Sequence, residues 1–353
     1  MKFNYLNPSI GDDLKKCKNI AIIKLAYIGD SVWLIPFINN LKRNLPDTKI
    51  TVIVNRGTEA FFLTSSNVDN VITFDRKNNN IWYYLKFIKS IRDIKAEAIF
   101  ELTDTDRPAL LSFLSGAKYI IGYNNENRWR NRLYTHICSG IKFQKHFVQY
   151  HLDVLTELGL EIFDTTLNIQ LNPECYKTIR VKVPELSNVK DIKTVVIHPG
   201  SRNILRQWGS DRFAALCDLL NETPNPCRII LTAGPNERHL LSEIVSAMKT
   251  PPPIISDSLT LYEFAALCEA SDLFIGNDSG PIHIAAARNT FVVGIYGPTL
   301  PQHVGAWTKR KIVIQKDLEC RPCYVESCKI SEHKKCLYSI TPVEVFQEIK
   351  NML

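Results

Sequence analysis

One stretch decides the fold of this chain: Ser271-Asp272-Leu273-Phe274-Ile275-Gly276-Asn277-Asp278-Ser279-Gly280-Pro281-Ile282-His283-Ile284-Ala285-Ala286-Ala287. Its apolar run breaks at polar residues and then resumes with small residues, which predicts a strand, a tight turn and a helix. Gly280 lets the backbone approach a ligand, and Pro281 suits the first turn of a helix. Because the free N–H groups of that turn attract an anion, the stretch predicts a phosphate-binding turn.

Length and composition predict a folded protein of two domains. A chain of 353 residues is too long for one ordinary core, and 45% hydrophobic with 22% charged residues is typical of a globular protein. No apolar run is long enough to span a bilayer, and the N-terminus lacks the apolar core of a signal peptide. We therefore expect a cytoplasmic protein, whose net charge of +7 suits an anionic partner without requiring one.

Strands and helices alternate in the first half. A buried-strand pattern at 20–25 leads through Gly29-Asp30 into a helix whose apolar positions recur every three residues from Val32 to Leu41. Further strands are predicted at 50–54, 71–74, 98–102 and 119–122. Helical patterns such as 81–94 separate them, so the alternation predicts a parallel sheet covered by helices on both faces.

The second half repeats this organisation after a polar, proline-containing linker. Its predicted elements are a strand at 194–198, a helix at 211–220, a strand at 228–231, helices at 237–248 and 261–268, and then the opening stretch. The expected domains are 1–175 and 194–341, joined by the linker 176–193, with the C-terminal helix 342–353 as a candidate to pack back on the first domain. We therefore predict an α/β fold of two doubly wound, Rossmann-like domains facing a central cleft.

Small or polar turns follow four of the predicted strands, at the carboxyl ends where such sheets bind ligands. These turns are Gly29-Asp30, Pro199-Gly200-Ser201, Gly234-Pro235 and Asp278-Ser279-Gly280. No Gly-x-Gly-x-x-Gly fingerprint follows either leading strand, and the sequence has no P-loop and no Gly-x-Ser-x-Gly elbow. These motifs therefore argue against a dinucleotide dehydrogenase, a P-loop phosphotransferase and a serine hydrolase.

Four of the ten cysteines cluster late in the chain. They are Cys320, Cys323, Cys328 and Cys336, with His333 between the last two. The Cys-x-x-Cys start has the spacing of metal ligands, but the remainder is less regular than a zinc ribbon. The cluster is therefore either a metal site or a reduced structural loop, and the scattered cysteines are expected to pack as small apolar residues.

Taken together, the four turns resemble the heptosyltransferases of glycosyltransferase family nine. The matching residues are Gly29-Asp30 with Pro36, His198-Pro199-Gly200-Ser201 with Arg206-Gln207-Trp208, Leu231-Thr232-Ala233-Gly234-Pro235, and the run from Asn277 to Ala287. The resemblance extends from Ile20 to the final helix after Pro342 and is greatest to the heptosyltransferase III-like branch. It implies a GT-B fold in which the second domain holds a nucleotide-sugar donor and the first holds the acceptor.

The resemblance also implies a reaction. We expect an inverting glycosyltransferase that uses no metal or other cofactor and transfers heptose from ADP-heptose to the inner core of lipopolysaccharide or lipooligosaccharide. Such an acceptor is embedded in the inner leaflet, so peripheral contact with the cytoplasmic membrane is expected and a nucleic-acid partner is not. Two alternatives stay open: a family relative with another nucleotide-sugar donor, and a non-catalytic or nucleic-acid-binding protein of the same fold.

Asp30 matches the family's proposed base, which takes the proton of the attacking acceptor hydroxyl. Its alternative role is to cap a helix N-terminus, where Asp is favoured. A helix N-terminus and an enzyme cleft have opposite effects on the pKa of a carboxyl that acts as a base. A helix N-terminus lowers the pKa of a carboxyl, whereas an apolar, closed cleft raises that pKa.

The resemblance places the donor diphosphate at the turn that precedes Pro281. The Ser279 hydroxyl and the backbone N–H groups at Gly280 can donate hydrogen bonds to it. Asp278 would repel a phosphate, so its expected role is to fix the turn or to face the sugar hydroxyls. His283 lies one helical turn after Ser279 and is either structural or part of the same site.

Further donor contacts are expected from the second domain. Arg206 falls where the family carries a lysine on the donor phosphates, so a planar fork replaces a point charge; its alternative role is a solvated surface charge. Gly200 and Ser201 are expected to complete the phosphate cradle. Either Asn236 or Glu237 occupies the place of a family carboxylate that contacts the ribose.

Basic and aromatic residues alternate between Lys118 and His151, a pattern that suits nucleic acid, a solvated loop or an acidic sugar. The basic members are Lys118, Arg128, Arg130, Arg132, Lys142, Lys145 and His146. The family resemblance favours recognition of the acidic sugars and phosphates of a lipopolysaccharide inner core. We therefore predict Arg56, Arg128 and Arg130 as acceptor-binding residues.

Overall fold

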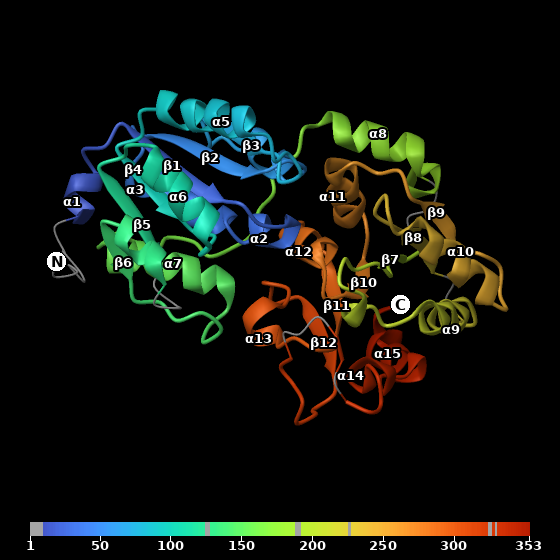
Figure 1. Ribbon diagram of the computed structural model, residues 1–353. Helices are drawn as coiled ribbons and strands as arrows, with labels where there is room; N and C mark the ends of the chain where they lie inside the picture. Colours follow the sequence, from blue (N-terminus) through green and yellow to red (C-terminus); the bar gives the residue numbers. More distant parts are fainter. Residues whose placement is uncertain (1–9, 124–127, 188–191, 225–226, 324–326, 329) are drawn as a thin grey trace. The chain divides into compact units, whose positions relative to one another are not determined.

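The computed structural model describes residues 10–123, 128–187, 192–224, 227–323, 327–328 and 330–353 (Figure 1). The chain divides into two compact units, Met1–Gln170 and Leu171–Leu353, and each contains a parallel six-stranded sheet. This architecture confirms the predicted α/β fold with two doubly wound domains. No helix in the described ranges has both the length and the apolar character needed to cross a lipid bilayer.

The sheet of the N-terminal unit has the strand order β3-β2-β1-β4-β5-β6. Its strands are β1 (Asn19–Lys24), β2 (Lys49–Asn55), β3 (Asn70–Phe74), β4 (Ala98–Glu101), β5 (Tyr119–Tyr123) and β6 (His136–Cys138). The helices are α1 (Ile10–Leu14), α2 (Ile28–Val32), α3 (Ile35–Asn44), α4 (Ala60–Leu63), α5 (Ile81–Asp93), α6 (Asp106–Leu114), the 3-10 helix η1 (Trp129–Leu133) and α7 (Phe147–Glu157). The central strands are continuous apolar runs because helices cover both of their faces.

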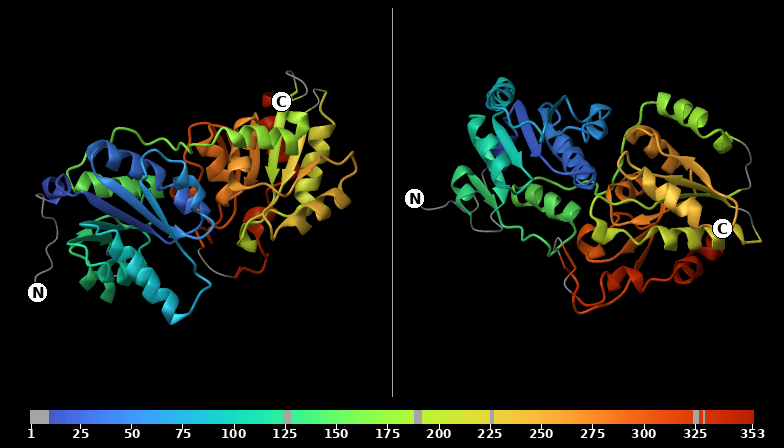
Figure 2. Two further views of the ribbon diagram at one scale, coloured as in Figure 1. Left: turned by 90° about the horizontal axis from the view of Figure 1, so that it is seen from above. Right: turned by 45° about the vertical axis from the view of Figure 1, so that its right-hand side comes forward.

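Successive strand residues point to opposite faces of this sheet, so each face has its own core. On one face, Ala21 of β1 packs in a cluster with Phe87 of α5 and Leu111 of α6. On the other face, Phe37 of α3 meets Phe100 of β4 edge to face, with ring centroids 5.2 Å apart. Figure 2 shows helices on both faces of the sheet. The turns at the carboxyl ends of the strands are thereby fixed on a rigid layer.

The sheet of the C-terminal unit repeats this order, reading β9-β8-β7-β10-β11-β12 from one edge to the other. Its strands are β7 (Thr194–His198), β8 (Arg228–Thr232), β9 (Ile254–Ser256), β10 (Leu273–Asn277), β11 (Phe291–Tyr296) and β12 (Lys311–Gln315). The α-helices are α8 (Glu174–Lys182), α9 (Ser210–Asn221), α10 (Arg238–Ala247), α11 (Leu261–Glu269), α12 (Gly280–Ala287), α13 (Pro301–Val304), α14 (Lys335–Tyr338) and α15 (Pro342–Ile349). The 3-10 helices are η2 (Pro184–Ser187), η3 (Ile204–Arg206) and η4 (Lys350–Met352).

The predicted linker 176–193 needs correction, because most of α8 lies within it. Cys175 and Ile179 are four residues apart and share the buried side of α8. Lys182 at the end of the helix pairs with Glu263 of α11, at 2.8 Å between Nζ and Oε2. The polar composition of this segment therefore reflects an exposed helix face, and α8 is part of the C-terminal unit.

The C-terminal helix also differs from the expectation that it packs back on the first domain. Val345 and Ile349 of α15 are fully buried in the main core of the C-terminal unit, together with Trp208 and Phe213. The Trp208 indole N–H donates to the carbonyl of Ile340 just before the helix, at 2.9 Å. This apolar face anchors α15 to its own unit.

Candidate active site

The predicted phosphate turn lies between β10 and α12. Because β10 pairs with β7 in a register that sets Gly276 opposite His198, the ends of these two strands are neighbours. The fully buried Asn277 joins them: its amide Nδ2 donates to the carbonyl of Pro199 at 2.6 Å, and its Oδ1 accepts the N–H of Trp208 at 3.0 Å. One side chain thus fixes the β10 turn to the loop that follows β7.

Asp278 is the second residue that organises this edge. Its carboxylate is almost fully buried, and its Oδ2 accepts Arg206 Nη1 at 3.0 Å and the Thr299 hydroxyl at 2.6 Å. Arg206 comes from η3 after β7, and Thr299 follows β11. These contacts favour the first of the two roles expected for Asp278, which is to fix the turn.

Two donors at this edge are buried without a protein partner. Among the described residues, neither the Ser279 hydroxyl nor the Arg206 Nε–H has a hydrogen-bond acceptor. Ser279 precedes the first residue of α12 in extended conformation, and its side chain does not cap the helix. Buried polar groups are nearly always hydrogen-bonded, so these donors indicate a ligand that accepts hydrogen bonds.

Arg202 adds a second positive charge that the sequence reasoning missed. Burial lowers the pKa of Arg202, and the charge of the neighbouring Arg206 lowers it further. Asp278 pairs with Arg206, and Arg202 adds positive charge to the same loop, which suits an anionic ligand. The signal in the sequence was the pair of arginines in the loop from Ser201 to Trp208.

Glu237 occupies the edge of β7 and β8, whereas Asn236 is exposed. The Glu237 Oε2 accepts the N–H of Gly234 at 3.1 Å and lies 3.3 Å from His198 Nε2. This contact with His198 holds the pKa of the Glu237 carboxyl below its usual value despite partial burial. A Cβ at Gly200 would lie 2.2 Å from the same oxygen, so a larger residue there would displace the Glu237 carboxylate. The geometry favours Glu237 over Asn236 as the carboxylate of this edge.

Ser201 and His283 are both buried in the C-terminal unit. The carbonyl of Ser201 accepts Gln207 Nε2 at 2.8 Å, which closes the loop that carries Arg202 and Arg206. His283 lies in the first half of α12, where its burial suits either of the roles expected for it. Their contact with a donor stays a prediction.

Asp30 lies at the start of α2 in the N-terminal unit and is partly exposed. Its Oδ2 accepts the N–H of Tyr27 at 3.3 Å, so the carboxylate does interact with the helix N-terminus as the alternative role requires. This long contact occupies one oxygen only. The other oxygen leaves room for the base role, which stays a prediction.

Lys24, the last residue of β1, is a buried cation that the sequence reasoning missed. Its Nζ donates to the carbonyl of Leu102 at 2.7 Å and lies 3.1 Å from His151 Nε2, whose Nδ1 is 3.0 Å from the hydroxyl of Tyr123. Burial lowers the pKa of Lys24, and among its neighbours the charge of Asp30 opposes this most. The signal was a lysine ending an otherwise apolar strand, six residues before Asp30.

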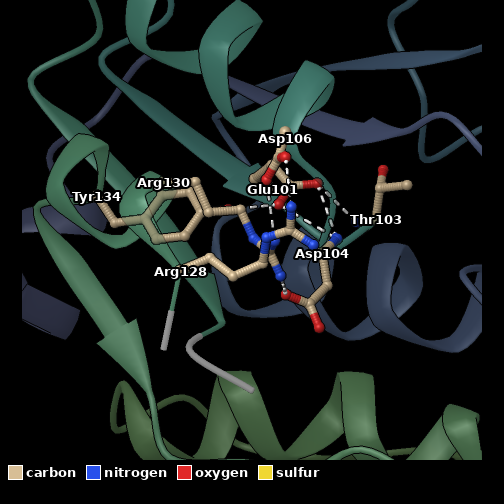
Figure 3. A network of polar contacts seen from close by, with 7 residues as sticks. All are labelled: Glu101, Thr103, Asp104, Asp106, Arg128, Arg130 and Tyr134. Atoms are coloured by element: carbon tan, nitrogen blue, oxygen red, sulfur yellow. Dashed lines mark hydrogen bonds and ion pairs between the residues drawn. The ribbon is translucent and has the colours of Figure 1, made fainter. Parts of the chain in front are cut away.

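The predicted acceptor residues have different surroundings. Figure 3 shows Arg130 inside a network after β4: Nη2 lies 2.8 Å from Asp104 and Nη1 lies 3.0 Å from Asp106. The Arg130 side chain is 2% exposed, which favours a structural role over the predicted acceptor contact. Arg128 also pairs with Asp106, at 3.1 Å, but its side chain is 49% exposed and it stays a candidate.

Glu101, the last residue of β4, also belongs to this network. Its carboxylate accepts the Thr103 N–H at 2.8 Å and the Tyr134 hydroxyl at 2.7 Å. Burial outweighs these hydrogen bonds and raises the pKa of Glu101 to about 7. Asp104, which follows in the left-handed region at φ 61°, donates its N–H to the same carboxylate.

Three further basic residues of the predicted acceptor surface make local contacts. Arg56 is exposed and pairs with Asp75 at 3.1 Å. Lys145 pairs with Asp153 at 2.7 Å, and His146 accepts the Val148 N–H at the start of α7. These contacts fit the solvated-loop alternative, and an acceptor contact by Arg56 stays a prediction.

The late cysteines are free thiols of the C-terminal unit: Cys320, Cys323 and Cys328 lie in the loop before α14, and the buried Cys336 lies in that helix. Within the described part of the chain, no three His, Cys, Asp or Glu side chains are arranged to hold a metal ion. The Cys323 N–H donates to the carbonyl of Pro298 at 2.9 Å, and Arg321 Nη2 donates to the carbonyl of Thr299 at 2.7 Å. The loop therefore holds in place the segment after β11, whose Thr299 donates a hydrogen bond to Asp278.

Comparison with known proteins decides the family. The model of glycosyltransferase family 9 (heptosyltransferase) matches residues 84–334. This chain belongs to glycosyltransferase family 9. The lipopolysaccharide heptosyltransferase 3 of Escherichia coli is 30% identical to this family 9 enzyme over 287 residues, which cover 78% of this chain and 82% of that protein.

Solved structures share the GT-B fold of this enzyme. A family 9 glycosyltransferase from Veillonella parvula superposes with a TM-score of 0.82 at 21% identity, covering 95% of this chain and 97% of that one. The Escherichia coli heptosyltransferase WaaC with ADP-2-deoxy-2-fluoro heptose superposes with a TM-score of 0.71 at 18% identity, covering 95% and 100%. The family match includes the whole edge around Asp278 and begins after Asp30.

Proposed function

We propose that this family 9 enzyme is an inverting heptosyltransferase that transfers heptose from ADP-heptose to a lipopolysaccharide core acceptor at the inner face of the cytoplasmic membrane. The observation that carries the proposal is a pair of buried donors, the Ser279 hydroxyl and the Arg206 Nε–H, which have no acceptor among the described residues. Both lie near the N-terminus of α12, where Asp278 holds Arg206. Such an edge suits the diphosphate of a nucleotide sugar. The names of the similar enzymes, and the ADP-heptose analogue in WaaC, support the choice of sugar.

In this proposal the chain's own residues act on both the attacking acceptor hydroxyl and the departing diphosphate. The acceptor oxygen forms a bond to the anomeric carbon while the bond from that carbon to the diphosphate breaks, and attack from the opposite face inverts the configuration. Asp30 takes the acceptor proton. Arg206, Arg202 and Ser279 stabilise the charge that develops on the departing ADP, so the reaction needs no metal ion.

Replacing Asp30 tests the base. Asp30→Asn keeps the size of the side chain and its hydrogen bond to Tyr27, and we expect it to lower kcat by about 10²–10⁴-fold with unchanged ADP affinity. Asp47→Asn, at an exposed position, serves as the matched control and retains full turnover. Near-normal turnover by Asp30→Asn would contradict the assignment.

A panel of donors tests the sugar and the class of activity. Purified enzyme is incubated with a core acceptor and either ADP-heptose, ADP-glucose or UDP-glucose, and nucleotide release is measured. We expect release from ADP-heptose only. Release from another donor would replace heptose in the proposal, and no release from any would count against transfer.

A further inference from the structure

Helix α5 has one side against the sheet and one side that is exposed among the described residues of the N-terminal unit. Phe87 and Ile91 are buried, whereas Ile81, Trp82 and Leu85 are 64%, 74% and 50% exposed. In Figure 1 and in both views of Figure 2, the helix lies at the outer boundary of the N-terminal unit. Three large apolar side chains within five residues point to a partner other than water.

Helix α6, beside α5, also has exposed apolar residues. Leu110 and Phe113 are 43% and 51% exposed, on the side of α6 opposite to the buried Leu111 and Ser112. The two helices pack side by side on one face of the sheet, and Arg92 of α5 donates to a carbonyl at the end of α6. We define the α5–α6 face by its exposed apolar residues, Ile81, Trp82, Leu85, Leu110 and Phe113.

Positive charge accompanies the apolar residues of α5. Lys86 lies one helical turn after Trp82, and Lys89 lies one turn after Leu85, so these side chains share the exposed side. Arg92 is also exposed, and Asp93 at the end is the helix's one acidic residue. Tryptophan with lysine and arginine on one helix face is typical of segments that lie in a membrane interface.

We propose that the α5–α6 face docks the enzyme on an anionic lipid bilayer. Trp82 and Leu85 enter the interfacial region, while Lys86 and Lys89 contact the phosphates of the headgroups. The charge of the helix selects this occupant, because an anionic bilayer attracts juxtaposed lysines and a neutral surface does not. The inference rests on the membrane location in the proposed function and names the face that makes the contact, and lipid binding without substrates tests it separately from turnover.

The first experiment is pelleting of the full-length protein with vesicles. We expect binding to phosphatidylcholine vesicles that contain about 30% phosphatidylglycerol, and binding at least about tenfold weaker to phosphatidylcholine alone. Trp82→Ser/Leu85→Ser and Lys86→Glu/Lys89→Glu should each weaken binding to the anionic vesicles about tenfold. The control Arg180→Glu/Val181→Ser alters an equally exposed pair on α8 and should bind as the wild type does.

A second experiment tests whether this face enters the bilayer, and it does not depend on a variant that binds more weakly. Brominated lipids should quench part of the tryptophan fluorescence of the wild type, and Trp82→Phe should remove most of that quenching. The proposal is overturned if the wild type does not bind anionic vesicles. It is also overturned if the α5 variants bind as well as the α8 control, or if Trp82→Phe leaves the quenching unchanged.

Discussion

Two turns at equivalent positions in the two sheets differ in how their polar side chains are paired. Because both sheets have the same strand order, the turn after β4 in the N-terminal unit corresponds to the turn after β10 in the C-terminal unit. The β4 turn is filled by Arg130 between two carboxylates. The β10 turn holds one buried carboxylate, Asp278, and leaves the hydroxyl of Ser279 without a partner in the described structure.

The difference shows that topology alone does not make a ligand site at a strand end. A turn whose charges pair with one another has no charge left for a ligand, whereas a turn with an unpartnered hydroxyl beside a helix N-terminus retains affinity for an anion. The N-terminal unit has its candidate functional groups at the neighbouring β1 turn, where the charge of Asp30 raises the pKa of the buried Lys24 against the effect of burial.

The largest expected difference lies between the two arginines. Arg130→Met should lower the free energy of unfolding by about 3–5 kcal/mol, because it leaves the buried Asp104 without its counter-charge, whereas Asp106 keeps its pair with Arg128. Arg206→Met should lower it by at most about 2 kcal/mol, since Arg206 is partly exposed and Thr299 still donates to Asp278. Urea unfolding measures both values.

For ADP affinity we expect the reverse, with the larger loss in Arg206→Met and the smaller in Arg130→Met. Arg206→Met is expected to weaken ADP binding about 10–100-fold through loss of a charge-assisted contact, as measured by calorimetry. Arg130→Met, assayed where it remains folded, should bind ADP as the wild type does. Equal losses of ADP affinity in both variants would remove the distinction between the turns.

The next effect is the pH dependence that Glu101 gives to the β4 turn. Its pKa is about 7 in the folded protein and about 4.3 in the unfolded chain. Between these values the folded protein holds a proton that the unfolded chain has released. The favourable contribution is complete below the unfolded pKa and is lost as the pH rises through 7.

Glu101→Gln removes this titration while keeping the side-chain shape. The difference in unfolding free energy, wild type minus variant, should therefore fall by about 2–3 kcal/mol from pH 5 to pH 8. Urea unfolding across that range measures it. A difference that is constant with pH would mean that the hydrogen bonds to Glu101 keep it ionised throughout.

The contrast between the turns also explains what the sequence could predict. The central strands and the turns of small and polar residues were predictable because continuous apolar runs end at them, as β10 ends at Asn277. Strands β6 and β9 have only three residues each, and β12 is half exposed, so none has a distinctive pattern. Helix α8 was predicted as a linker because only two of its residues are buried.

Roles within the site were less predictable than its position. Arg128 and Arg130 are two residues apart, yet only Arg130 is buried between carboxylates more than twenty residues earlier in the chain. No local pattern distinguishes them, because the choice depends on how the β4 turn folds. Arg202 and Lys24 were overlooked for the same reason: their neighbours come from other strands and loops.

The smallest expected effects belong to one hydroxyl in each turn. Thr103 Oγ1 accepts the Leu25 N–H at 2.9 Å, whereas the Ser279 hydroxyl has no partner among the described residues. Thr103→Val should therefore lower the unfolding free energy by about 1–2 kcal/mol and leave ADP affinity unchanged. Ser279→Ala should leave stability unchanged and weaken ADP binding about 3–10-fold.

Both variants remove a single hydroxyl at corresponding places in the two sheets, so each serves as the control for the other. Urea unfolding and ADP calorimetry give an unfolding free energy and an ADP affinity for each variant. We expect Thr103→Val to change only the first and Ser279→Ala only the second. A loss of stability in Ser279→Ala would mean that the protein itself satisfies this hydroxyl. The β10 turn would then be closed in the same sense as the β4 turn, and the donor assignment would rest on Arg206 and Arg202 alone.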